Sequence, residues 1–110
     1  LVDQPEIKKE LKQITKLTEQ NSDVDTDWQN FVKSFDQVHT NFYKRLNEEF
    51  KDLSPNDYKL CTYLRMNLAT KEIASLMNIS IRSVETNRYR LRKKLGLDSD
   101  TNLSQFLMNY

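Results

Sequence analysis

The sequence predicts an all-α protein. Only one glycine and two prolines occur in 110 residues, whereas strands and their turns use more of both. Apolar side chains recur at spacings of three and four along most of the chain, which is the period of an amphipathic helix. Residues that favour helix ends stand at the borders of these segments. We expect an N-terminal helix and break over residues 1–25, a long amphipathic helix over 26–53, and a helical domain over 54–110.

The clearest element runs from Ser80 to Leu97, with Ser80 as its N-terminal cap and Gly96 in the left-handed position after the last turn. Val84, Arg88, Leu91 and Leu95 recur at helical spacing, so the three apolar side chains among them mark one buried face. The opposite face is polar and basic, and carries Arg82, Thr86, Tyr89, Arg90 and Lys93. From residue 82 to residue 94 there are six basic side chains and one acidic side chain, a net charge of +5. Such a helix suits the major groove of DNA, although a solvated basic face on an ordinary surface helix is the alternative.

Charge is divided unevenly between the two halves of the chain. Residues 1–53 hold eight basic and eleven acidic side chains, a net charge of −3, whereas residues 54–110 hold nine and five, a net charge of +4. A polyanion would dock on the positive half. The single cysteine, Cys61, and the single histidine, His39, exclude an internal disulfide and an ordinary zinc site. No nucleophile triad or phosphate-binding loop occurs, so we expect no enzyme, no cofactor and no metal.

Membrane and targeting signals are missing from the sequence. No apolar run approaches the roughly 18 residues that span a bilayer, and no signal-peptide pattern occurs. The chain starts at Leu1 rather than at methionine. We therefore expect a fragment of a longer protein, cytoplasmic and without membrane insertion of its own.

The first half predicts two helices. Pro5 begins the first, whose narrow apolar stripe needs a partner helix and consists of Ile7, Leu11, Ile14 and Leu17. Thr26 and Gln29 form a capping box for the second, which extends for about 26 residues, roughly 40 Å. The aromatic positions on or beside its stripe are Trp28, Phe31, Phe35, Phe42 and Phe50. We expect residues 42–53 to pack on the following domain, and residues 28–38 to meet residues 5–19 or a second chain.

Four shorter helices are expected from Ser54, which with Pro55 signals a helix start. Asn67 ends the first of them in place of the usual glycine. Thr70 caps the second, Asn78 closes it, and its inward positions are Ile73, Ala74 and Met77. A three-residue turn then leads into the basic helix, which is the sequence form of a helix-turn-helix. The apolar positions of the last short helix are Leu103, Phe106 and Leu107.

From Leu53 to about Leu107 the chain resembles the LuxR-type (GerE-like) helix-turn-helix family. The matching segments read K-E-I-A at 71–74, I-S-I-R-S-V-E-T-N at 79–87 and L-R-K-K-L-G-L at 91–97, with no gaps in their spacing. Two positions depart from the family pattern, since its usual His is Asn87 and its usual Gly is Asn67. Arg88 stands where many relatives carry an apolar residue. The resemblance implies a four-helix domain that binds double-stranded DNA and regulates transcription.

The upstream segment extends this likeness. D-W-x-x-F-x-x-x-F-D-Q-V-H-x-x-F-Y at 27–43 and L-C-x-Y-L-R-M-N at 60–67 are similar to the C-terminal end of Bacteroidetes regulators. Those two-component-like proteins have a periplasmic sensor of propeller repeats, a triple-tyrosine domain, one membrane span and a coiled coil. The resemblance implies that residues 5–20 end a coiled coil, and that the parent protein is membrane-tethered and senses a glycan-related signal.

On this hypothesis the helix from Ile81 to Leu95 enters the major groove. The candidates for base contacts are Glu85, Thr86, Arg88 and Tyr89. The candidates for backbone contacts are Thr70, Lys71, Ser80, Arg82, Ser83, Asn87, Arg90, Lys93 and Lys94. Because one such module reads few base pairs, we expect a homodimer formed by the upstream helices, the last helix, or both. Two alternatives share these features: a helical dimerisation or signalling module that does not bind DNA, and a sigma-factor-like promoter reader.

Overall fold

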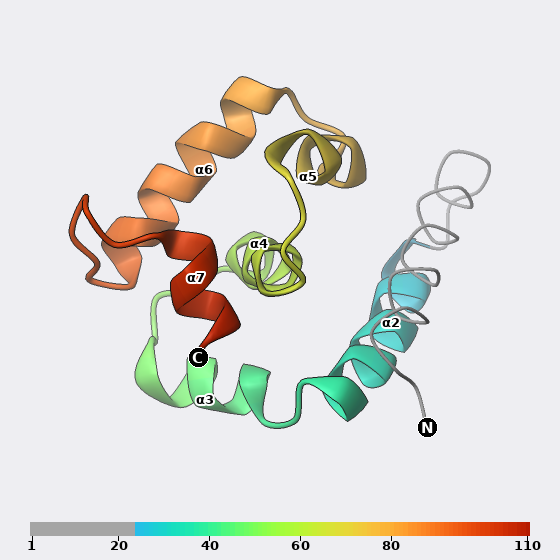
Figure 1. Ribbon diagram of the computed structural model, residues 1–110. Helices are drawn as coiled ribbons and strands as arrows, with labels where there is room; N and C mark the ends of the chain where they lie inside the picture. The colour runs from blue at the N-terminus through green and yellow to red at the C-terminus, as the bar shows by residue number, and fades with distance from the viewer. Residues whose placement is uncertain (1–23) are drawn as a thin grey trace. The chain divides into compact units, whose positions relative to one another are not determined.

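Six helices and no strand make up residues 24–110, the part of the chain that this computed structural model describes (Figure 1). Their bounds are α2 Val24–Val38, α3 Phe42–Glu49, α4 Pro55–Arg65, α5 Thr70–Met77, α6 Ile81–Lys94 and α7 Leu103–Met108. The expectation of an all-helical protein is therefore confirmed for these residues. The helix expected over residues 5–19 lies outside them.

The single long helix expected over residues 26–53 is wrong, because the chain leaves the helix after Val38 and starts again at Phe42. Asn41 takes the left-handed conformation with φ of 67°, which a continuous helix does not allow. The break is closed locally, since the Phe42 N–H donates to the His39 carbonyl at 3.2 Å. The capping box expected at Thr26 is also wrong, because α2 already includes Val24.

Contacts along the chain group it into two units that divide between Lys44 and Arg45. In the first unit the apolar stripe of α2 and the first residue of α3 form a row of aromatic side chains. Phe31 and Phe35 lie 6.0 Å apart between ring centroids, and Phe35 and Phe42 lie 5.9 Å apart. All three are buried. His39 stacks on Phe35, with 4.3 Å between the ring centroids.

In the second unit the helix ends follow the expected signals in most places. Ser54 caps α4, since its hydroxyl accepts from the Asp57 N–H at 3.1 Å while the Asp57 carboxylate accepts from the Ser54 N–H at 2.8 Å. The chain turns through left-handed conformations at all three expected positions, which are Asn67, Asn78 and Gly96. The short linkers of the domain are therefore set by residues that tolerate positive φ.

One expected cap is wrong. The N-cap of α5 is Ala69 rather than Thr70, and the Glu72 carboxylate accepts a hydrogen bond from the Ala69 N–H at 3.0 Å. Thr70 is the first residue of the helix. Of the positions expected to point inward, Ile73 and Ala74 are buried, whereas Met77 is half-buried.

The core of the second unit joins α4 to its neighbours. Helix α5 packs on α6, and α4 packs on α7 and on α6 (Figure 1). The fully buried side chains of this core include Leu60, Leu64, Ile73, Val84, Leu91, Leu103 and Leu107. Arg65 fastens the end of α7, because its guanidinium donates to the Leu107 carbonyl at 2.7 Å. Tyr110 reaches α3 and donates to the Arg45 carbonyl at 3.1 Å. Helix α6 is thereby packed against α5 and α4 along its buried side.

Within residues 24–110, no helix combines the length and apolarity needed to cross a bilayer. The same residues hold no cluster of three or more His, Cys, Asp or Glu side chains that could bind a metal ion.

Candidate nucleic-acid interface

The N-terminus of α6 is fixed by Ser80, as expected. The Ser80 backbone is extended, with φ of −72° and ψ of 158°, and its hydroxyl accepts from the Ser83 N–H at 3.0 Å. Val84 and Leu91 are fully buried and Leu95 is 6% exposed. This buried stripe sets the rotation of the helix, so the residues on its opposite side must face outward.

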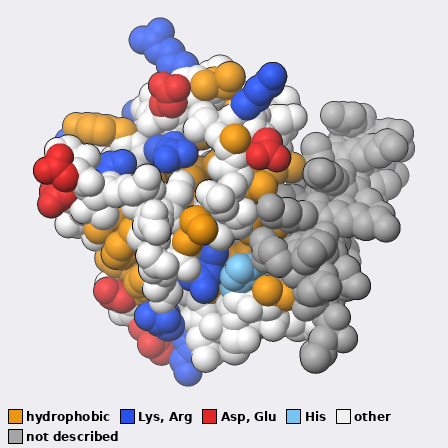
Figure 2. All heavy atoms as spheres, viewed as in Figure 1, with side chains coloured by type: hydrophobic (Ala, Val, Ile, Leu, Met, Phe, Trp, Pro, Cys, Tyr) orange, Lys and Arg blue, Asp and Glu red, His pale blue; other side chains and the backbone are white. Residues whose placement is uncertain are grey.

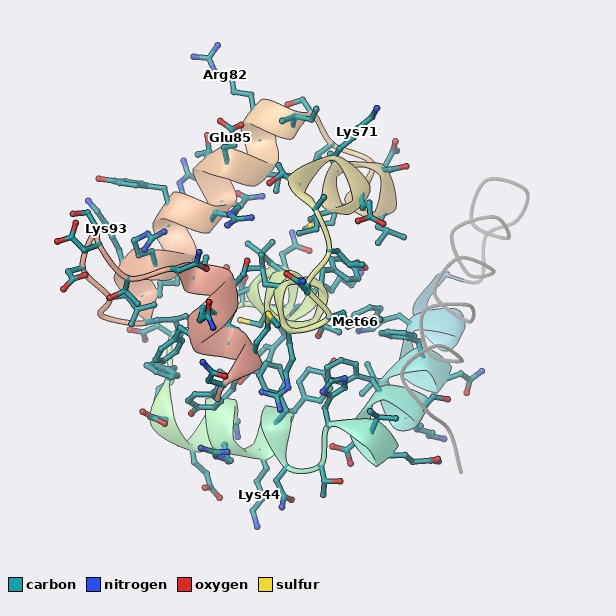
Figure 3. All side chains as sticks on the ribbon, in the orientation of Figure 1. Lys44, Met66, Lys71, Arg82, Glu85 and Lys93 are labelled. Atoms are coloured by element: carbon teal, nitrogen blue, oxygen red, sulfur yellow. The ribbon has the colours of Figure 1, made fainter. Side chains whose placement is uncertain are left out.

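The outward side of α6 carries a mixed polar surface, which we call the outer face. All of its members are exposed: Arg82, Glu85, Thr86, Tyr89 and Lys93. Figure 3 shows Arg82, Glu85 and Lys93 extending outward from α6. Tyr89 is 57% exposed, and the Lys93 ammonium lies 4.6 Å from the centre of its ring. A large exposed aromatic side chain among hydrogen-bonding groups can contact base edges or sugars in a groove.

A second surface runs along one side of α6 next to its N-terminus. A shallow hollow of about 340 Å³ is lined there by Ser80, Arg82, Ser83, Thr86, Asn87 and Arg90. We call this surface the flank. It combines two guanidinium groups with hydroxyl and amide donors and the first turn of a helix, which is the chemistry that binds phosphate oxygens.

Lys71 adds a cation from α5. It is exposed in the first turn of that helix, and Figure 3 shows its side chain extending away from the domain. No ion pair involving Lys71, Arg82 or Arg90 occurs among residues 24–110. Figure 2 shows basic side chains on the surface over α5 and α6, with acidic ones among them. These three cations are therefore available to an anionic partner.

Arg88 differs from the other expected base contacts. Its guanidinium donates to the Thr70 hydroxyl of α5 at 3.3 Å, and the residue is half-buried. Burial, together with the neighbouring charge of Arg92, lowers the pKa of the Arg88 guanidinium. The structure thus places Arg88 and Thr70 between α5 and α6 and away from the outer face.

Two more cations of α6 are engaged within the domain. Lys94 forms an ion pair with Asp57 at the N-terminus of α4, with 2.5 Å between its nitrogen and Oδ2. Burial raises the pKa of Asp57, but hydrogen bonds from Lys94 and Ser54 outweigh it, so the pKa lies below its ordinary value. Arg92 donates to the Thr101 carbonyl and, at 3.2 Å, to the Asp98 carbonyl. The net charge of +5 on α6 therefore overstates the charge that it offers to a partner.

Sequence reasoning did not identify the role of Asp57. The S-P-N-D segment at 54–57 signals a capped helix, and that role is present. The pairing of Asp57 with Lys94 cannot be seen in the local sequence, because the two residues are 37 positions apart in the chain. The same holds for the contact between Arg88 and Thr70.

Comparison with known proteins places this domain in a family. The sequence profile GerE, described as "Bacterial regulatory proteins, luxR family", matches residues 51–107. No curated protein and no solved structure matches the chain. The matched region covers α4, α5 and α6 and most of α7. Proteins of this kind are DNA-binding transcription regulators and generally not enzymes. The chain belongs to the luxR family of bacterial regulatory proteins.

Proposed function

We propose that the chain binds double-stranded DNA sequence-specifically by inserting α6 into the major groove. The observation that carries this proposal is the division of α6 into a buried apolar stripe and an exposed outer face. A groove about 12 Å wide accepts one helix, and only a helix that is anchored along one side presents the other side rigidly. The neighbouring flank would then lie along a phosphate backbone.

Within this proposal, the outer face supplies the base contacts through Glu85, Thr86 and Tyr89. A carboxylate can accept a hydrogen bond from the cytosine amino group, and a threonine methyl can meet the thymine methyl. Backbone contacts come from the flank residues other than Thr86 and from Lys71 on α5. Arg88 and Thr70 fix the angle between α5 and α6, which sets how deeply the outer face can reach.

We also propose that the parent protein works as a homodimer and as the output domain of a membrane-bound sensor. This proposal is supported by the likeness of residues 27–43 to such regulators and by the short reading length of one helix-turn-helix. In α7, Leu103 and Leu107 are used in the core of the domain, whereas Met108 is 42% exposed. Sedimentation equilibrium of the chain with and without DNA measures the oligomeric state.

Selection of bound duplexes from a random pool tests the DNA proposal. Wild-type protein should enrich one short motif, and Tyr89→Ala should bind with a changed motif because a base-contacting side chain is lost. Lys71→Gln should keep the wild-type motif and bind all duplexes more weakly, since a phosphate contact carries no sequence information. Enrichment of no motif at low salt would contradict sequence-specific binding.

A further inference from the structure

The ion pair between Asp57 and Lys94 joins two side chains with unequal freedom. The Asp57 carboxylate also accepts the Ser54 N–H at 2.8 Å, and its side chain is 14% exposed. The Lys94 side chain is 37% exposed and consists of a four-carbon stem that ends in a point charge. The carboxylate is therefore held in place by the cap of α4, and the lysine is the partner that is able to move.

Lys94 belongs to the same side of α6 as the flank. A hollow of about 190 Å³ is lined by Lys94 and, among others, by Asn56, Asp57, Asn87 and Arg90. Asn87 and Arg90 also line the hollow of the flank. Positions 83, 87, 90 and 94 recur at helical spacing, so Lys94 continues the flank by one turn. A DNA strand that follows the flank would next reach Lys94.

We infer that Asp57 is a built-in competitor of a DNA phosphate for Lys94. It holds the ammonium on the protein, and so lowers both the affinity for DNA and the dependence of that affinity on salt. This inference rests on the proposed DNA binding of α6. It assigns Asp57 a regulatory role, since any change that removes the negative charge of Asp57 frees Lys94 to contact one further DNA phosphate.

A four-protein cycle measures the competition: wild type, Asp57→Asn, Lys94→Gln and the double variant. Asparagine keeps an oxygen that can accept the Ser54 N–H and removes only the charge. Each neutralised phosphate contributes about 0.9 to the slope of log K against log salt. Asp57→Asn should therefore steepen the slope by about 0.9 and tighten binding roughly tenfold at 50 mM salt. Lys94→Gln should leave the wild-type slope unchanged, and the double variant should return to it.

Lys51→Gln is the matched control, because it removes the same charge from an exposed turn before α4. If Lys94→Gln flattens the wild-type slope by about 0.9 more than this control does, Lys94 already binds DNA and the inference is wrong. The comparison of Lys94→Gln with Lys51→Gln tests the inference even if Asp57→Asn fails to fold, which far-UV circular dichroism would reveal. If all four proteins bind DNA with equal salt slopes, the competition by Asp57 is refuted, whereas the proposed DNA binding is not. If none of the four proteins binds DNA at low salt, both the proposed function and this inference are refuted.

Discussion

Two arginines on α6 have opposite surroundings and should give opposite results when each is changed to glutamine. Arg82 is exposed on the outer face and forms no ion pair among the described residues. Arg92 donates to the carbonyls of Asp98 and Thr101 and so fixes the loop before α7. Arg82→Gln should flatten the salt slope of DNA binding by about 0.9, which is roughly an eightfold loss of affinity at 0.1 M salt. Its free energy of unfolding should stay within about 0.5 kcal/mol of wild type.

Arg92→Gln should lower the stability of the domain and leave the salt slope of DNA binding unchanged. Hydrogen bonds to a charged donor contribute about 1.5–3 kcal/mol when they are buried, and this pair is partly exposed, so we expect a loss of about 1–2 kcal/mol in stability. The salt slope should remain that of wild type. Urea unfolding measures the first quantity, and fluorescence anisotropy of a labelled duplex across a salt series measures the second. Equal slopes for the two variants would refute the separation of α6 cations into available and engaged ones.

Two further predictions concern stability. Asn78 has φ of 56° and ψ of 47°, so Asn78→Ala should destabilise the domain by about 1 kcal/mol and Asn78→Gly should not, as measured by urea unfolding; equal losses would contradict a conformational cause. The pKa of Asp57 is lowered in the folded protein, so its contribution to stability is complete above its ordinary pKa of 3.8 and is lost as the pH falls through the folded value. Asp57→Asn should remove this acid-dependent part, and an unchanged pH profile would show that the carboxylate gains nothing from folding.

Much of the helix-turn-helix was predictable because its signals are local. Ser54 and Ser80 cap the helices that they were expected to cap, and Asn67 and Asn78 turn left-handed. In each case the residue that decides the conformation lies in the segment that it controls. The exposed outer face of α6 was predictable for the same reason, since helical periodicity relates it directly to the buried stripe.

The break between α2 and α3 could not be read from periodicity. Val38 and Phe42 are four residues apart, so the apolar stripe continues in the sequence whether or not the helix does. The break lies in residues 39–41, where Asn41 is left-handed, and asparagine also occurs inside helices. The roles of Arg88 and Lys94 were hidden for another reason, because their partners lie 18 and 37 residues away and depend on how the helices pack.

The placement of DNA on α6 can be measured residue by residue with amide chemical shifts. We would titrate the chain with a selected duplex at 50 mM salt and record the shift of each backbone N–H. The largest changes should fall on Lys71 and on residues 80–93, and the N–H groups of residues 103–108 should change least. Shifts confined to residues outside α5 and α6, or no shifts at this salt concentration, would contradict insertion of α6 into the major groove.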